Sequence, residues 1–146
     1  MPEQETLQRA RRDAAQGKSP STQAGEFVRE QIHHIREGRH GARSTKQAIA
    51  IALSEARRSG VPLAPPKGQG ETTRKARRDV AAGARGKKPS VKRSRASVKA
   101  LKKEPRTAAS RTALSRQAKQ AARKRGPRAR SQAAKKAART RQRAAR

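Results

Sequence analysis

The chain has 146 residues, of which 40 are Lys or Arg and 10 are Asp or Glu, so its formal charge is +30 with histidine neutral. It contains no Cys, Trp or Tyr and a single Phe, which excludes disulfides, cysteine-based zinc sites, thiol catalysis and an aromatic-anchored core over most of the length. No stretch approaches the roughly 20 apolar residues of a membrane helix, and the first residues lack the apolar run of a secretory signal. We therefore expect a soluble, cytoplasmic chain whose charge surplus is neutralised by nucleic acid.

The surplus is concentrated in the second part of the chain. Residues 1–63 hold 11 basic and 7 acidic residues, a net +4, whereas residues 64–146 hold 29 and 3, a net +26. Large apolar residues follow the opposite trend, and a segment with few apolar groups and high charge does not offset the entropy of folding. This pattern predicts a mostly α protein: a small helical head of two to three helices (1–63), a Pro/Gly linker (64–70), a basic helix (71–83) and a largely disordered Ala/Lys/Arg-rich tail (84–146).

The first two helices of the head have clear boundary signals. Residues 2–15 predict a mostly solvated helix that ends at Gly17. A second helix is expected from Ser19 or Ser21, with Pro20 in its first turn and Gly38 at its end. Its apolar residues fall at three- and four-residue steps and predict one buried stripe: Ala24, Phe27, Val28, Ile32 and Ile35.

The third helix is expected between Ser44 and Gly60. The run Ser-Thr-Lys-Gln at 44–47 has the form of a capping box, in which the serine hydroxyl accepts a backbone N–H and the glutamine reaches back. Ile49, Leu53 and Ala56 would form its buried face. The alternation in AIAIAL also fits a strand, but alanine is a poor strand former, and we favour the helix.

A short repeat links the two parts of the chain. Residues 5–17 (ETLQRARRDAAQG) return 66 residues later as 71–83 (ETTRKARRDVAAG), with eight of thirteen positions identical. Both copies carry Arg-Arg-Asp ahead of a glycine that is expected to end the helix. The repeated helix is interpreted either as a phosphate-contacting element or as a solvated helix duplicated by descent.

Residues 25–61, and above all GARSTKQAIAIALSEARRSGV, resemble a family of small basic bacterial proteins with a Ser/Thr-Lys-Gln-Ala-Ile-Ala-Ile-x-Leu-Ser-x-Ala-Arg motif. Members are uncharacterised and are sometimes labelled plasmid stabilisation proteins. The tail resembles linker-histone-like Ala/Lys/Arg-rich bacterial proteins in composition. Neither resemblance implies a catalytic residue.

The tail contains three helix-compatible stretches, residues 90–104, 107–125 and 130–146, separated by Pro105 and by Gly126–Pro127. Ala, Lys, Arg and Gln favour helices, but like charges three and four residues apart oppose them in water. We therefore expect a tail that is mostly coil alone and that gains helix on DNA or RNA.

Phosphate neutralisation is the chemistry this composition supports best. Arginine-rich segments favour bidentate phosphate contacts, and the near absence of aromatic residues disfavours stacking on single-stranded bases. Duplex DNA is thus expected rather than RNA, with weak sequence preference. The expected nucleic-acid-binding residues are Arg39, Arg43, Lys46, Arg77, Arg78, Lys92, Arg93, Arg95, Arg123, Lys124, Arg125, Arg128, Arg130, Lys135, Lys136, Arg139, Arg141 and Arg143.

The sequence gives less support to other chemistry. Glu30, His33, His34, Glu37 and His40 occupy three- and four-residue steps, which suits either a divalent metal or a solvated helix end with basic groups near the C-terminal dipole; we expect no metal and no cofactor. A basic turn at Arg39 and Arg43 leading into a helix start at Ser44 is either a phosphate dock or an ordinary capped helix, and we favour the latter. No nucleotide-binding loop or hydrolase triad is recognisable, so no enzyme is expected.

Three functions fit these features. The first is a non-enzymatic, histone-like protein of the nucleoid that binds or compacts DNA without sequence preference. The second is a protein-interaction module, connected with plasmid maintenance through the resemblance, that the tail tethers to nucleic acid. The third is an RNA- or ribosome-associated basic protein. No membrane partner is expected.

Overall fold

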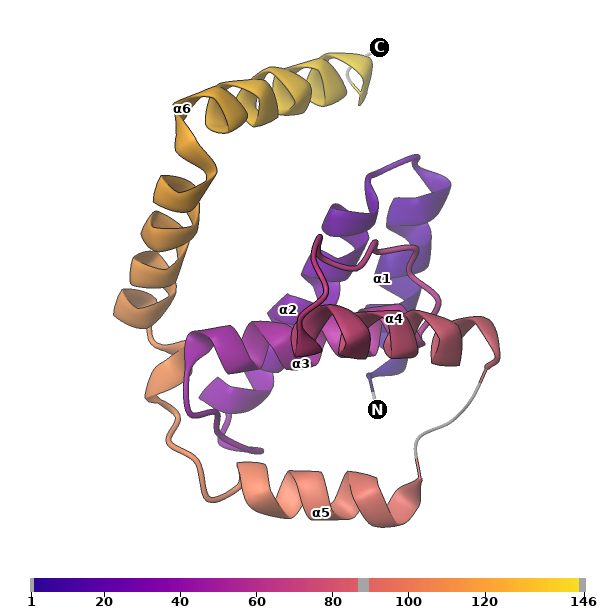
Figure 1. Ribbon diagram of the computed structural model, residues 1–146, viewed down its shortest axis with the longest axis vertical. Helices are drawn as coiled ribbons and strands as arrows, with labels where there is room; N and C mark the ends of the chain where they lie inside the picture. Colours follow the sequence, from indigo (N-terminus) through magenta and orange to yellow (C-terminus); the bar gives the residue numbers. More distant parts are fainter. Residues whose placement is uncertain (1, 87–89, 145–146) are drawn as a thin grey trace. The chain divides into compact units, whose positions relative to one another are not determined.

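The computed structural model describes residues 2–86 and 90–144 (Figure 1), and every regular element in these ranges is a helix. The prediction of a mostly α protein is confirmed. The elements are α1 (Gln4–Ala15), α2 (Pro20–Arg36), α3 (Thr45–Arg58), α4 (Glu71–Ala84), α5 (Val91–Leu101), the 3₁₀ turn η1 (Thr107–Ala109) and α6 (Arg111–Ala144). They divide into two compact units, residues 1–110 and 111–146. In the described part of the chain, no helix has the length and apolarity needed to cross a membrane.

The helix starts follow the capping signals in the sequence. Ser19 precedes α2, and its hydroxyl accepts the Thr22 N–H at 3.4 Å. Ser44 precedes α3 and accepts the Gln47 N–H at 3.2 Å, while Gln47 Oε1 reaches back to the backbone N–H of Arg43 at 2.7 Å. The reciprocal bond of a capping box thus falls one residue earlier than the sequence pattern predicts.

The core of the first unit is built largely from alanine. α2 packs against α1 and α3, and α3 packs against α2 and α4. Phe27 is fully buried and shares a cluster with Ala10, Ala24, Ala52, Ala56 and Val61. The partly buried Leu7, Val28, Leu53 and Leu63 pack against this cluster. Small side chains let helix backbones approach closely, which compensates for the scarcity of large apolar groups.

The buried face of α3 differs from the expected one. Ala48, Ala52 and Ala56 are buried at four-residue steps, whereas Ile49 and Leu53 are only half-buried. The reason is that α3 packs against both α2 and α4. Its alanines lie where the helices approach most closely, and its longer side chains lie at the margins of these contacts.

The first unit extends beyond the head of residues 1–63 that composition predicts. α4 packs on α3, and the segment after α5 returns to the turn between α2 and α3. The N–H of Gly41 donates to the Leu101 carbonyl at 2.9 Å, and the N–H of Ala42 donates to the Pro105 carbonyl at 3.0 Å. Backbone hydrogen bonds of this kind leave little trace in composition, because they use no particular side chain.

The expectation of a largely disordered tail is wrong for the described residues, because α5 and α6 are helices. α6 has one interruption, at Gly126, where φ is 72° and ψ is 169° immediately before Pro127. Here the high helix propensity of Ala, Arg, Lys and Gln outweighs the repulsion between like charges. The predicted break at Gly126–Pro127 is confirmed.

The order of the helices reveals that the 66-residue repeat extends past its first element. α3 begins at Thr45 and α6 begins at Arg111, again 66 residues apart, and each start is directly preceded by a serine. Gly60 and Gly126 hold the same spacing and both have positive φ, 89° and 72°. The chain therefore carries one order of three helices twice, α1–α3 and α4–α6.

Candidate functional site

The second unit presents an uninterrupted cationic surface. Residues 111–146 contain 14 Lys or Arg and no acidic residue. All the Lys and Arg side chains between Arg111 and Arg143 are exposed, and none forms an ion pair with another described residue. This helix therefore has no internal counter-charge among the described residues, which favours binding of a polyanion.

α5 is a second exposed cationic helix. None of its residues is buried, and Lys92, Arg93, Arg95 and Lys99 all reach solvent. Val91 and Val98 are also exposed, at 64 % and 42 %. The helix is held at its C-terminal end by the bonds from Gly41 and Ala42 described above, so its basic side chains project from an anchored element.

The two copies of the repeated helix bury an alanine at equivalent positions and expose arginines at equivalent positions. Ala10 in α1 and Ala76 in α4 are buried at 5 % and 3 % exposure. The Arg-Arg pairs that follow them are exposed in both helices, Arg11–Arg12 and Arg77–Arg78. The pair in α1 was not among the expected binding residues, although the repeat in the sequence already contained the signal.

The aspartate that follows each Arg-Arg pair has a structural role. Asp79 is 5 % exposed and accepts hydrogen bonds from the Ser54 hydroxyl at 2.7 Å and from Arg58 Nε at 2.8 Å. Burial by itself raises the pKa of Asp79, but these hydrogen bonds and the charge of Lys75 outweigh it and hold the pKa below its usual value. Asp79 thereby fastens α4 to α3.

The expected glycine stop in the second copy is wrong. Gly17 ends α1 with φ of 67°, but its counterpart Gly83 lies inside α4, and the glycine with positive φ is Gly86. A Cβ on Gly83 would lie 2.2 Å from the Arg57 carbonyl oxygen. Gly83 is therefore required for the close approach of α4 to α3, a requirement that depends on tertiary packing.

All eighteen expected nucleic-acid-binding residues are exposed in the structure. Arg39 differs from the others because it forms ion pairs with Glu3 and Glu37. Arg43 and Lys46 lie beside the N-terminus of α3, but the hydroxyls of Ser44 and Thr45 are already engaged, with Gln47 and with the Ala108 carbonyl. Both hydroxyls at the helix start therefore have partners within the protein, and the choice between a capped terminus and a phosphate dock stays a prediction.

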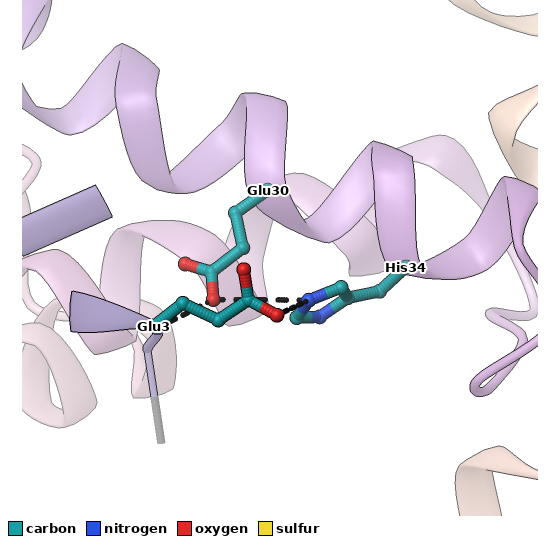
Figure 2. A group of neighbouring side chains, drawn as sticks. All are labelled: Glu3, Glu30 and His34. Atoms are coloured by element: carbon teal, nitrogen blue, oxygen red, sulfur yellow. Dashed lines mark hydrogen bonds and ion pairs between the residues drawn. The ribbon is translucent and has the colours of Figure 1, made fainter. Parts of the chain in front are cut away.

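A polar cluster of three residues, Glu3, Glu30 and His34, lies between the start of α1 and the second half of α2 (Figure 2). One ligand atom from each lies within 4.8 Å of the others. His34 Nε2 is 3.1 Å from Glu3 Oε1 and 3.8 Å from Glu30 Oε1. Glu3 was not among the expected residues, because it is 27 and 31 residues away in sequence and no periodicity connects it to α2.

The remaining members of the expected histidine cluster are placed elsewhere. His33 is exposed and pairs with Glu37 at 2.9 Å. His40 Nδ1 contacts the Gly41 carbonyl oxygen at 3.0 Å, and its ring meets that of His34 edge-on, with centroids 6.1 Å apart. The structure therefore replaces the expected five-residue group by a smaller one that includes Glu3.

Arg39 is the cation that contacts this cluster. Its Nη1 donates to Glu3 Oε1 and lies 3.0 Å from His34 Nε2. The hydrogen bond from Arg39, followed by that from His34, holds the pKa of Glu3 below its usual value. Glu3 is thus an ionised carboxylate at neutral pH.

No protein-family model matches the chain, and neither the curated proteins nor the solved structures compared with it include a match. The resemblance of residues 25–61 to the family of small basic bacterial proteins stays a prediction.

Proposed function

We propose that this protein binds duplex DNA without sequence preference and without catalysis, as a histone-like component of the nucleoid. The observation that carries the proposal is that residues 111–146 contain 14 Lys or Arg and no acidic residue. The 13 of these cations between Arg111 and Arg143 are exposed on a helix. Each cation that neutralises a phosphate releases a condensed counterion, which supplies affinity that is independent of sequence.

The repeated order of helices supports a packed role for the first copy and a DNA-binding role for the second. At the 66-residue spacing, the buried Phe27 of the first copy corresponds to Arg93 in the second, and Leu53 corresponds to Lys119. Both cations are exposed. The first copy thus keeps the apolar residues of a packed unit, and the second has cations at equivalent positions.

Sequence-specific readout is not part of the proposal. Base-edge recognition uses a few side chains held in a groove by a rigid element, whereas the cations of α6 are exposed along its length and are not fixed by described neighbours. Arginine provides most of these cations, and its planar guanidinium is suited to bidentate phosphate contacts.

The test compares the full chain with a chain ending at Ser110. That truncation keeps the whole first compact unit, including the segment after α5 that bonds to Gly41 and Ala42. Affinity for a mixed-sequence DNA duplex is measured over a range of salt concentrations. We expect the truncation to lose most of the affinity and to give a shallower dependence of log K on log salt. Equal affinity at equal salt would contradict the proposal.

A second experiment distinguishes binding to DNA from binding to RNA. Material purified from cells is treated with DNase or with RNase, and the bound fraction is followed. Release by DNase alone supports the proposal, and release by RNase alone would replace it with association with RNA or the ribosome. If neither nuclease releases the protein and the first unit captures one specific protein, an interaction module would be favoured.

A further inference from the structure

The cluster of Glu3, Glu30 and His34 contains a buried carboxylate with an unpartnered oxygen. The Glu30 side chain is 2 % exposed. Its Oε1 accepts the backbone N–H of Glu3 at 2.7 Å, but its Oε2 has no hydrogen-bond partner among the described residues. Oε1 faces His34, whereas the unpartnered Oε2 lies on the side away from it (Figure 2). A buried carboxylate without full compensation is costly, so a cation bound at Oε1 would stabilise Glu30.

Arg39 does not supply that charge to Glu30. Its guanidinium contacts Glu3, His34 and Glu37, and the structure gives it no contact with Glu30. Its side chain is half exposed, at 52 %. Burial, and then the negative charge of Glu30, raises the pKa of Glu55.

Two of the three spacings between the ligand atoms are close to those around a small tetrahedral cation. Bonds of about 2.1 Å to nitrogen and oxygen place the ligand atoms of a tetrahedral zinc about 3.4 Å apart. His34 Nε2 lies 3.1 Å from Glu3 Oε1 and 3.8 Å from Glu30 Oε1, on either side of that value. Glu30 and His34 occupy neighbouring turns of α2, and Glu3 approaches from the segment ahead of α1 (Figure 2).

We propose that Glu3, Glu30 and His34 bind one divalent transition-metal cation, best fitted by Zn²⁺, with water in the fourth position. An imidazole nitrogen beside two carboxylates suits Zn²⁺, whereas Mg²⁺ requires an all-oxygen octahedral shell. Arg39 leaves Glu3 and His34 on binding and keeps the contact that its Nε already makes with Glu37 at 2.8 Å. The bound cation would fasten the N-terminal segment to α2. This site is independent of the proposed binding of DNA.

The proposal is tested by calorimetric titration of the metal-free full chain with Zn²⁺ and, separately, with Mg²⁺. We expect one equivalent of Zn²⁺ to bind, a higher melting temperature in its presence and no binding of Mg²⁺ at the same concentration. Glu30→Gln and His34→Gln should each weaken Zn²⁺ binding at least tenfold. His33→Gln is the matched control, because this exposed neighbour on α2 pairs with Glu37 and lies outside the three ligands.

Arg39→Gln tests the displacement step. Removing the competing guanidinium should tighten Zn²⁺ binding, a result that a purely structural role of the cluster does not produce. The far-UV circular dichroism of each variant is compared with that of the unsubstituted chain, and Co²⁺ absorption reports coordination geometry independently of stability. Absence of Zn²⁺ binding to the full chain, unchanged affinity in His34→Gln, or a loss of affinity in His33→Gln as large as in His34→Gln would each overturn the proposal. Unchanged or weaker binding in Arg39→Gln would overturn the displacement of Arg39.

Discussion

The hydroxyl of Thr45, the first residue of α3, donates a buried 2.7 Å hydrogen bond to the carbonyl oxygen of Ala108, 63 residues further along the chain. Arg36 Nε makes a related bond to the next carbonyl, that of Ala109, at 3.0 Å. These two bonds and the backbone bonds from Gly41 and Ala42 attach the segment after α5 to α2, to α3 and to the turn between them. Polar contacts therefore hold this segment within the first compact unit.

Thr45→Val removes the donor and leaves the Ala108 carbonyl buried without its partner. We expect a loss of about 1–3 kcal/mol in the free energy of unfolding. The amides of Gly41 and Ala42 should also exchange faster with solvent deuterium, because their acceptors lie on the released segment. Thr45→Ser keeps the hydroxyl and is the control. Unchanged protection of both amides in Thr45→Val would contradict this attachment.

Gly83→Ala should separate α4 from α3, because the added Cβ would meet the Arg57 carbonyl oxygen at 2.2 Å. Gly25→Ala is the matched substitution, since Gly25 also lies inside a helix but has no heavy atom within 4 Å of its Cβ position. We expect thermal unfolding to show a lower melting temperature for Gly83→Ala and a gain of about 0.5–1 kcal/mol for Gly25→Ala. Equal effects of the two would show that helix propensity alone is being measured.

Asp79→Asn should remove a pH-dependent contribution to stability. Because the pKa of Asp79 is lowered in the folded state, its contribution is present above the unfolded pKa, about 4, and is lost as pH falls through the folded value. Unfolding by urea at several pH values should show a destabilised variant at pH 7 and a smaller loss on acidification than in the unsubstituted chain.

Asp13 provides the comparison for Asp79, because it is the equivalent residue of the repeat and its carboxylate pairs with Lys18 and with no other described residue. Asp13→Asn should lower the free energy of unfolding at pH 7 by less than Asp79→Asn does. The reverse order would show that the bonds from Ser54 and Arg58 do not stabilise the packing of α4.

Replacing Arg123, Lys124 and Arg125 together by Gln should weaken DNA binding and make the slope of log K against log salt less steep by about 3, at roughly 0.9 for each phosphate contact. The control is Arg9→Gln, because that guanidinium is engaged by Glu5 and Glu26 within the first unit. Fluorescence anisotropy with a labelled duplex provides the measurement. A slope that changes equally in both variants would argue against α6 as the contacting surface.

Local signals in the sequence predicted much of the fold. Ser19, Ser44 and the glycines at 17 and 38 set helix boundaries through short-range geometry, and Gly126–Pro127 set the break in α6. For the described residues after 83, the expected disorder was wrong, because composition measures net repulsion whereas helix propensity acts on each residue. Composition alone was enough to predict the cationic candidate site, because the charge of a segment this rich in Lys and Arg does not depend on which residues are neighbours.

By itself, the sequence determined the helical class and the capping of α2 and α3, which depend on neighbours within a few positions, and the excess of positive charge, which depends on composition alone. Only the tertiary structure decided that Gly83 is a contact rather than a stop and that Glu3 joins Glu30 and His34. These features arise from the approach of segments far apart in the chain. Burial and backbone hydrogen bonding determine that approach, and neither leaves a periodic pattern in sequence.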